Sequence, residues 1–320
     1  MKSAWSDHDA EETVARYAGE GVREDLALRL YTTRLLGRDP LLVLHGGGNT
    51  SVKTTVTDLL GDDTEVLCVK GSGWDMAEIE PAGLPAVRMD PLLRLWPLEV
   101  LSDEDMVRFQ RGALVDPSSP NPSVETLLHA FLPHKFVDHT HSAAVLALTD
   151  QSGDKALLKE VYGNRVALVD YVKPGFDLAK AAAQVYEDHP DVEGLILRKH
   201  GIFSFGATAR EAYELMVDLV SLAEDHIEAV GGGVSGGGGR SRGVFPSAHV
   251  PSELAPLSEV APIVRGLLAV QGDNSVADPV RMILEFRTSE AVLSYVNGKE
   301  LGRYSQVGVV TPDHVIRTKR

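Results

Sequence analysis

The chain has 320 residues, 43% of them hydrophobic and 24% charged, so it can bury a core without disulfides or metals. Its 46 acidic and 31 basic residues give a formal net charge of −15. This charge argues against binding to nucleic acid or to an anionic membrane, because such surfaces require clusters of lysine and arginine. An anionic substrate would therefore be held by a local pocket.

The cysteine count and the N-terminus narrow the class of protein further. Cys68, the single cysteine, lies in an apolar run and can form neither an internal disulfide nor a cysteine-based zinc cluster. The chain has no run of about 18 apolar residues, which predicts no membrane-spanning helix. The acidic start MKSAWSDHDAEE is unlike a signal peptide. We therefore expect a cytoplasmic protein.

Strands and helices are predicted to alternate along the first 230 residues. In the first half, the pattern predicts a helix over 22–36, strands over 41–45 and 65–69, and a helix that begins at Asn121. In the second half it predicts a strand running into a helix over 135–148, a helix over 177–190, a strand over 194–198 and a helix from Thr208 to about Val230. This alternation is typical of a layered α/β domain.

A glycine-rich segment divides the chain. The sequence GGGVSGGGGRSRG at 231–243 is typical of a flexible connector. We therefore predict a domain over 1–230, a linker over 231–248 and a small C-terminal extension over 249–320. Within the extension, RMILEFR favours a strand and SEAVLSYVNG favours a helix, so we expect a small α+β unit.

The sharpest chemical signal is the sequence Asp138-His139-Thr140-His141. Side chains two residues apart on a strand point to the same face, so both imidazoles could reach one metal ion. A third histidine, His200, follows an apolar strand and precedes a glycine, a position typical of a cleft. Three histidines and a carboxylate make a site suited to zinc, with an open position for substrate. Each motif alone is equally compatible with structural histidines.

The carboxylate candidate is Glu125, in the sequence NPSVE near the start of a predicted helix. Exposed N–H groups and the helix dipole favour an anion at this position. A glutamate in the first turn is also common simply because the dipole stabilises it, so both interpretations remain open.

Two glycine-rich loops, at 46–51 and 71–74, each follow a predicted strand. Their backbone N–H groups could close around a phosphate, with asparagine and serine side chains as further donors. Neither loop matches the Walker pattern or a dinucleotide-binding turn. The sequence HGGG is not accompanied by a GxSxG nucleophile elbow between a predicted strand and a predicted helix, which argues against an α/β-hydrolase.

These elements follow one another as GGNTS, GSG, SVE, HTH and KHG, and this series resembles the class II aldolase/adducin family over about residues 20–230. The resemblance implies a three-layer α/β/α domain. It also implies a homo-oligomer, often a tetramer, with active sites between subunits.

The resemblance implies a role for each matching residue. His139, His141 and His200 would hold zinc or another divalent metal, and Glu125 would bind the empty metal or serve as acid and base. Some aldolases of the family use a tyrosine from a neighbouring subunit as proton donor, and Tyr162 is the candidate here.

The resemblance also implies a phosphate-binding set. The matching positions are Gly48, Asn49, Ser72, Gly73 and Ser123. Val124 stands where sugar-phosphate aldolases commonly have a second serine, so one side-chain donor is lost.

The C-terminal sequence VVTPDHVIRTK resembles the rhamnulose-1-phosphate aldolase region of proteins fused to a short-chain dehydrogenase. The chain shows no dehydrogenase fingerprint at a strand–helix turn, so it resembles the aldolase region alone. The implied activity is cleavage of a ketose 1-phosphate into dihydroxyacetone phosphate and an aldehyde. A 4-epimerase, a dehydratase and a non-catalytic adducin-like module are alternatives on the same scaffold. The basic cluster His314, Arg317, Lys319 and Arg320 is expected either to fold toward the substrate opening or to remain a solvated terminus.

Overall fold

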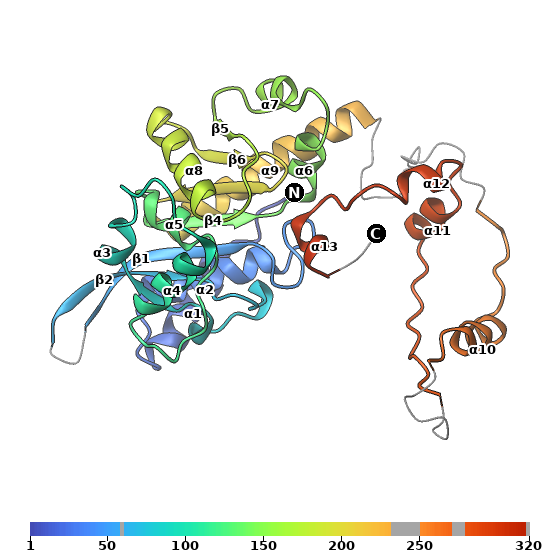
Figure 1. Ribbon diagram of the computed structural model, residues 1–320, viewed down its shortest axis with the longest axis horizontal. Helices are drawn as coiled ribbons and strands as arrows, with labels where there is room; N and C mark the ends of the chain where they lie inside the picture. Colours follow the sequence, from blue (N-terminus) through green and yellow to red (C-terminus); the bar gives the residue numbers. More distant parts are fainter. Residues whose placement is uncertain (58–60, 232–249, 271–278, 318–320) are drawn as a thin grey trace. The chain divides into compact units, whose positions relative to one another are not determined.

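A computed structural model describes residues 1–57, 61–231, 250–270 and 279–317 (Figure 1). The chain divides into two compact units, Met1–Val230 with Val309–Lys319, and Gly231–Gly308 with Arg320. The division differs from the predicted one, because residues near the C-terminus belong with the first unit. The predicted linker lies outside the described residues except for Gly231. In the described part of the chain, no helix has the length and apolar character needed to span a bilayer.

The first unit begins with α1 (Asp7–Ala18), α2 (Glu24–Gly37), β1 (Asn49–Thr57), β2 (Asp63–Val69), β3 (Ala86–Arg88), α3 (Met89–Leu93), α4 (Asp103–Gly112) and α5 (Thr126–Phe131). It continues with β4 (Phe136–Thr140), α6 (Ala143–Thr149), α7 (Asp154–Tyr162), β5 (Val166–Val169), α8 (Phe176–Asp188), β6 (Gly194–Leu197), β7 (Gly201–Gly206), α9 (Ala209–Gly231) and, near the C-terminus, α13 (Pro312–Arg317). Two 3-10 turns, Met76–Glu78 and Pro81–Gly83, lie between β2 and β3.

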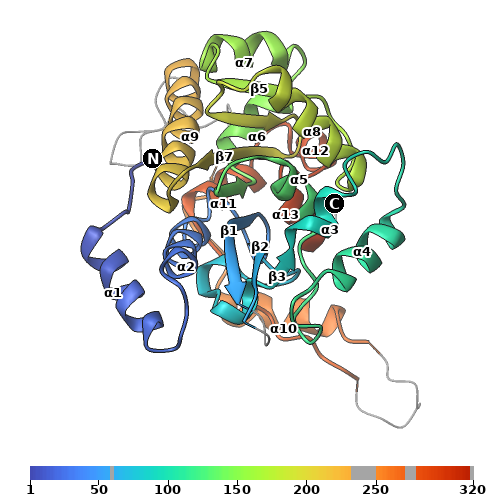
Figure 2. The same cartoon turned by 90° about the vertical axis from the view of Figure 1, so that its left-hand side faces the viewer.

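Seven strands of the described chain form one sheet in the order β3-β2-β1-β4-β7-β6-β5, which can be followed in Figure 2. Neighbouring strands are antiparallel except β5 and β6, which are parallel. β4 is the central strand, between β1 and β7. Side chains alternate between the two faces of each strand.

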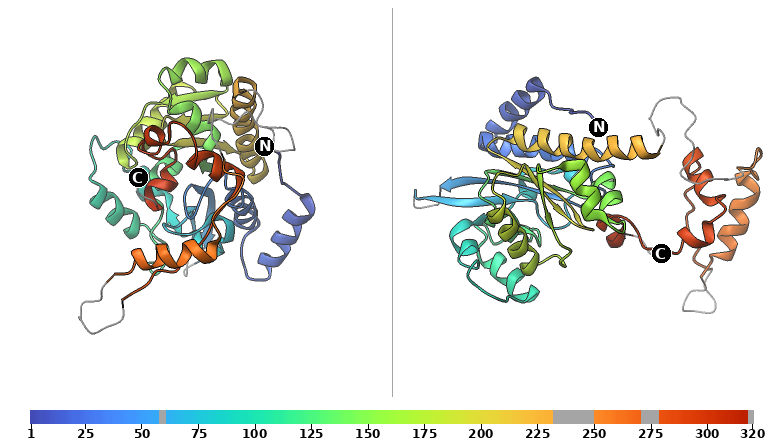
Figure 3. Two further views of the ribbon diagram at one scale, coloured as in Figure 1. Left: turned by 90° about the vertical axis from the view of Figure 1, so that its right-hand side faces the viewer. Right: turned by 90° about the horizontal axis from the view of Figure 1, so that it is seen from above.

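Helices cover both faces of this sheet, as the right-hand view of Figure 3 shows. On one face α3, α4, α5 and α8 pack around residues such as Leu127 and Phe203. On the other face α1, α2, α6, α7 and α9 pack around residues such as Leu30 and Met216. The predicted three-layer α/β/α domain is therefore confirmed.

Residues 41–45, which the sequence predicts as a strand, form turns instead. The amide of Leu42 donates to the carbonyl of Asp39 at 3.0 Å, and the side chains of Leu42 and Val43 join the core. The strand begins later, at Asn49. The apolar run is thus buried as a loop.

The helix predicted to begin at Asn121 begins at Thr126. The carbonyl of Asn121 accepts from the amide of Ser72 at 2.8 Å, and Pro122 forms a β-bridge with Gly71. Because this backbone pairs with the loop after β2, it cannot form a first helical turn.

The second unit contains the helices α10 (Leu257–Leu267), α11 (Glu290–Val296) and α12 (Leu301–Tyr304). The predicted helix in SEAVLSYVNG is confirmed as α11. RMILEFR, predicted as a strand, forms none, and the described pairing here is a single bridge between Val270 and Val280. These three helices bury no side chain, so they offer no apolar layer on which a strand could pack.

A buried ion pair fixes the central strand from the face opposite the histidines. Nη2 of Arg29 lies 2.5 Å from Oδ1 of Asp138, and both side chains are fully buried. Arg29 also donates to the hydroxyl of Thr32 at 2.6 Å. A buried charge that loses its partner is strongly destabilising, because its desolvation is no longer offset.

We therefore expect Arg29→Met to lower the free energy of unfolding by about 3–5 kcal/mol, measured by urea denaturation. Removing both charges, as in Arg29→Met with Asp138→Leu, should recover part of this loss. The matched control is Arg108→Met, whose exposed pair with Asp105 is expected to contribute less than about 1 kcal/mol. Equal effects of Arg29→Met and Arg108→Met would contradict the prediction.

Candidate metal centre and substrate cavity

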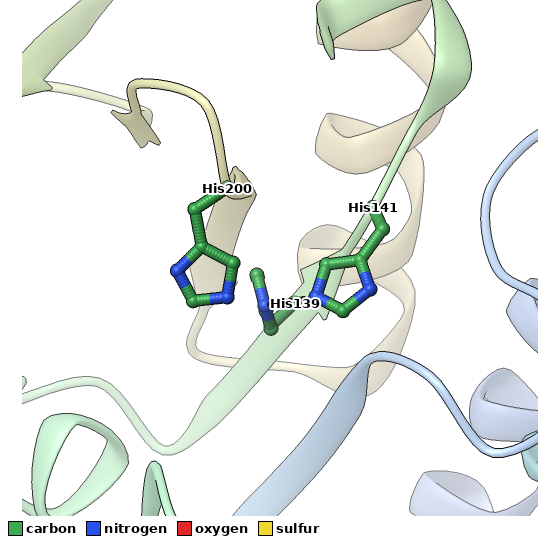
Figure 4. A group of neighbouring side chains, drawn as sticks. All are labelled: His139, His141 and His200. Carbon is green, nitrogen blue, oxygen red and sulfur yellow. Dashed lines mark hydrogen bonds between the residues drawn. The ribbon is translucent and has the colours of Figure 1, made fainter. Parts of the chain in front are cut away.

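Three histidines from two neighbouring strands meet at one point (Figure 4). His139 lies in β4 and His141 just after it, while His200 precedes β7. One nitrogen from each of the three rings lies within 4.8 Å of the others, and the set could hold a metal ion. The structure thus brings together the three imidazoles predicted from the sequence.

The alternation of side chains along β4 explains why two of these rings share a face. Asp138 points to the opposite face and pairs with Arg29, and the hydroxyl of Thr140 on that face donates to the sulfur of Met216 at 3.2 Å. The His139 ring stacks on Phe203, with ring centres 4.2 Å apart and planes 15° apart.

His200 is positioned by the tight turn between β6 and β7. Lys199 adopts a left-handed φ of 60°, and the amide of His200 donates to the carbonyl of Leu197 at 3.0 Å. A side chain at Gly201 would place its Cβ 2.4 Å from the Thr140 carbonyl oxygen. Glycine after His200 is therefore required for the turn to lie against β4.

The hydrogen bonds of two rings define which nitrogens are available to a metal. Nδ1 of His139 lies 3.1 Å from the carbonyl oxygen of Ile202, and Nδ1 of His141 lies 2.6 Å from Oδ1 of Asp313. Both Nδ1 atoms must donate to these oxygens, so both Nε2 atoms carry lone pairs when the rings are neutral. The two Nε2 atoms are 3.1 Å apart, a repulsive arrangement that a shared cation would relieve. The donor set therefore fits a divalent ion such as zinc.

Burial favours the neutral form that metal ligation requires. It holds the pKa of His139 well below its ordinary value, and positive charge on His141 or His200 would lower it further. Burial also lowers the pKa of His200.

Glu125 completes the cluster from the start of α5. Its side chain, 6% exposed, makes no capping hydrogen bond to the helix. Instead Oε2 lies 3.4 Å from Nε2 of His139, and Oε1 lies 3.5 Å from Nε2 of His200. Oε1 is buried and has no hydrogen-bond partner among the described residues. The carboxylate thus faces the histidines with one oxygen available.

A buried chain of hydrogen bonds holds the other oxygen of Glu125. Nδ2 of Asn49 donates to Oε2 at 2.7 Å, and the side-chain oxygen Oδ1 of Asn49 accepts from Nε2 of His129. Nδ1 of His129 lies 2.7 Å from the hydroxyl of Ser51. Because burial lowers the pKa of His129 to about 3, this ring is neutral, with Nε2 donating to Asn49 and Nδ1 accepting from Ser51. The chain fixes the Asn49 amide so that its nitrogen faces the carboxylate.

A cavity of about 320 Å³ opens beside this cluster. Eight of the predicted site residues line it: Gly48, Asn49, Ser72, Gly73, Ser123, Glu125, His141 and His200. The side-chain nitrogen Nδ2 of Asn49 donates to Glu125 and, at 3.1 Å, to the hydroxyl oxygen of Ser123. That oxygen also accepts from the backbone amide of Glu125 at 3.2 Å, so neither bond uses the hydroxyl's own hydrogen. Val124, 47% exposed, places an apolar side chain at the edge.

Tyr162 is not part of this site. It packs in the core beside Leu158 and Val166, and its buried hydroxyl has no hydrogen-bond partner among the residues described. Burial raises its pKa, which further disfavours proton transfer. Within its own subunit Tyr162 thus lies away from the cavity, and its role as a proton donor to a neighbouring subunit, which the family resemblance implied, stays a prediction.

Two residues at the site were missed in the sequence. Lys70, 3% exposed, lines the cavity, and its ammonium group donates to the carbonyl of Gly46 at 2.9 Å. Its position between an apolar strand and a glycine loop is a signal that could have found it. Asp313 contacts His141 across 172 residues of chain, and no local pattern indicates such a contact.

The predicted basic cluster at the C-terminus is only partly described. His314 lies with its Nδ1 2.6 Å from the hydroxyl of Thr311. The side chains of Arg317, Lys319 and Arg320 lie outside the described residues. The residue of this segment that contacts a site histidine is an acid, Asp313.

Comparison with known families identifies both parts of the chain. Residues 29–227 match the Class II Aldolase and Adducin N-terminal domain, and residues 255–320 match the second domain of class II aldolases. A solved structure, the N-terminal class II aldolase domain of a conserved protein from Thermoplasma acidophilum, is 39% identical with a TM-score of 0.63. It matches 71% of this chain and 99% of that chain.

Two curated proteins are also similar. YuxG of Bacillus subtilis, named an uncharacterized oxidoreductase, is 34% identical over 291 residues, which are 91% of this chain and 41% of YuxG. A methylthioribulose-1-phosphate dehydratase of Yersinia enterocolitica is 33% identical over 115 residues, or 30% of this chain and 55% of that enzyme. The chain thus spans about half, or less, of the curated relatives it matches.

The geometry predicts that removing one ring abolishes tight metal binding. We expect the purified chain to bind about one divalent ion per molecule, as a three-histidine site should. His200→Ala should lose this ion, measured by elemental analysis after dialysis against a metal buffer. His189→Ala, at an exposed position, is the control and should keep it. Retention of the ion in His200→Ala would show that the histidines do not form the site.

Proposed function

Because the chain belongs to the class II aldolase and adducin family, we propose that it is a divalent-metal-dependent aldolase acting on a ketose 1-phosphate. Its products would be dihydroxyacetone phosphate and an aldehyde, as from a rhamnulose-1-phosphate-like sugar. The observation that carries the proposal is the convergence of three histidines and Glu125 on one cavity. A cytoplasmic homo-oligomer, such as a tetramer, is part of the same proposal.

His139, His141 and His200 would hold the metal through ring nitrogens, with zinc the first choice for three imidazoles. When bound, a divalent ion acts as a Lewis acid on the substrate's carbonyl and adjacent hydroxyl oxygens. Neutral histidines suit this task, because they leave the positive charge of the ion uncompensated. Stacking of His139 on Phe203 and the turn at His200 hold the rings in place before substrate arrives.

Glu125 is the residue that moves protons in the proposed reaction. Aldol cleavage removes a proton from the hydroxyl of the future aldehyde and breaks the adjacent carbon–carbon bond. The electron pair of that bond stays on the three-carbon fragment, whose carbon then takes up a proton. Oε1 of Glu125 has no hydrogen-bond partner in the described chain, while Oε2 is held by Asn49. One oxygen is therefore available to exchange these protons, and the other fixes the orientation.

Lys70 supports the choice of a phosphorylated substrate. Lys70 lines the cavity. Its ammonium group donates one hydrogen bond to the carbonyl of Gly46, so two N–H groups remain for an anion. A cation here compensates for Val124, which lacks the hydroxyl that sugar-phosphate aldolases commonly have. The Ser123 hydroxyl and the backbone of the loop at Ser72 and Gly73 line the same cavity.

A dehydratase is the second candidate, because one similar protein carries that name with a 1-phosphorylated substrate. A 4-epimerase would use the same metal ligands. An adducin-like binding module would not require Glu125 to be held beside three histidines. The name of YuxG does not decide the reaction, since the match covers 41% of that protein.

Product analysis separates these reactions. The metal-loaded chain is incubated with a panel of ketose 1-phosphates, and products are identified by mass spectrometry and by enzymatic assay of dihydroxyacetone phosphate. Two carbonyl fragments support the proposed aldolase. Loss of water from the intact substrate would identify a dehydratase, and an isomeric sugar an epimerase. A metal-loaded chain without turnover on any of them would contradict the proposal.

Glu125→Gln should retain the metal yet lose about 10²–10⁴-fold in kcat, because the amide cannot exchange protons. The measurements are metal content per chain and steady-state rates on the best substrate. Glu214→Gln, at a surface ion pair with Arg210, is the matched control. Full activity in Glu125→Gln would remove this residue from the mechanism.

Lys70→Met should raise KM for a phosphorylated substrate by about 10–100-fold, the effect of losing hydrogen bonds to a charged group. Its effect on an unphosphorylated analogue should be small. Burial lowers the pKa of Lys70 to about 8, against the opposing effect of Asp75, Asp313 and Glu125. The ammonium form therefore dominates below that pH, and affinity for the anion should fall as the pH rises through it.

Lys155→Met is the control for charge removal, because Lys155 forms an exposed pair with Asp170. An equal change in KM for the phosphorylated and unphosphorylated compounds would argue against a phosphate contact. The pH profile of Lys70→Met should lack the loss of affinity seen in the wild type.

A further inference from the structure

The C-terminal segment, residues 309–317, is part of the unit that carries the histidines. It belongs to the same compact unit as Met1–Val230, although residues 231–308 separate the two in the chain. Pro312 of this segment lines the cavity beside His141 and Glu125. The segment therefore reaches the site itself.

Asp313 makes the decisive contacts of this segment. Its side chain is 2% exposed, and Oδ1 lies 2.6 Å from Nδ1 of His141. Oδ2 accepts a hydrogen bond from the amide of Leu44 at 2.8 Å. Both oxygens have donors, so the carboxylate is fixed in orientation as well as in position.

The glycine loop is shaped to admit this carboxylate. A Cβ at Gly47 would lie 1.6 Å from Oδ1 and 2.3 Å from Cγ of Asp313. No residue with a side chain fits at Gly47 while Asp313 stays in place. The middle glycine of the run therefore makes room for Asp313.

The three imidazoles differ in what holds their second nitrogen. Nδ1 of His139 faces the backbone carbonyl of Ile202, and Nδ1 of His200 has no hydrogen-bond partner within the described ranges. Of the three, His141 is the ring with a carboxylate on Nδ1. A carboxylate hydrogen-bonded to the second nitrogen fixes the tautomer and orientation of a metal-binding histidine. It also makes the metal-binding nitrogen more basic, and so a stronger electron-pair donor to the metal.

We propose that Asp313 is a positioning residue of the metal centre, which holds His141 with its Nε2 lone pair toward the ion. The C-terminal segment then completes the site, because the cavity wall includes Pro312 only when this segment is packed against the rest of the unit. The inference rests on the proposed metal centre and adds to it a residue that does not touch the metal.

Metal titration of the full-length chain tests this role without an activity assay. The metal is removed with a chelator, and Co²⁺ is titrated while its visible absorption is recorded, with Zn²⁺ measured by competition. Asp313→Asn should bind the ion about 10–100-fold more weakly, the usual effect of losing such a partner. Gly47→Ala, which keeps the carboxylate but displaces it, should weaken binding in the same way. Both should alter the Co²⁺ spectrum, because the His141 ring turns.

Asp90→Asn is the matched control, because Asp90 forms an exposed pair with Arg94 at 2.8 Å. It should bind Co²⁺ as the wild type does. Thermal unfolding of the metal-free proteins is measured in parallel. Lower stability of Asp313→Asn with an unchanged Co²⁺ spectrum and affinity would show a purely structural role and overturn the inference.

The outcomes also separate this inference from the proposed function. If the wild type binds the ion and Asp313→Asn binds it equally tightly, the inference is wrong while the proposed metal centre stands. If the wild type binds no divalent ion, the metal centre and the inference both fail. Weaker binding and a changed spectrum in both Asp313→Asn and Gly47→Ala would support the positioning role.

Discussion

The site depends on two imidazole lone pairs that face each other in a buried space. His139 and His141 each use Nδ1 as a donor, so when both rings are neutral the lone pairs of their Nε2 atoms face each other at 3.1 Å. Such an arrangement is unfavourable unless a cation is shared. The fold maintains it because Arg29 and Asp138 hold the opposite face of β4. The repulsion between the two Nε2 lone pairs is therefore confined to the position that a metal ion would occupy.

Glu125 owes its orientation to a buried series of hydrogen-bonded side chains, of which Asn49 lines the cavity. Buried polar groups are costly unless they are hydrogen-bonded, and Ser51, His129 and Asn49 satisfy one another in series. The series ends on one oxygen of Glu125 and leaves its other oxygen beside His200. The oxygen of Glu125 that stays available for a metal ion or a proton is therefore Oε1. A carboxylate held this way is oriented before substrate arrives.

Local sequence patterns correctly predicted the features that depend on neighbouring residues in the chain. Period-two alternation placed His139 and His141 on one face, and the glycine after His200 marked its turn. The strand expected at 41–45 failed because apolar residues are buried equally well in a loop. Tyr162 entered the core and Asp313 entered the site for a different reason. Their positions depend on which distant elements pack together, and no spacing in one sequence encodes that.

The glycine run after residue 45 shows how one motif can serve several constraints. Gly48 has a φ of 60°, and a Cβ there would lie 2.7 Å from the His139 carbonyl oxygen, whereas Gly47 makes room for Asp313. The close approach of Asp313 and of the His139 backbone is thus sufficient to explain these two glycines. Metal ligands and a mobile proton are common to aldolases, epimerases and dehydratases. The choice among these reactions must then come from the rest of the cavity wall, where Lys70 and Val124 differ from a serine-rich phosphate site.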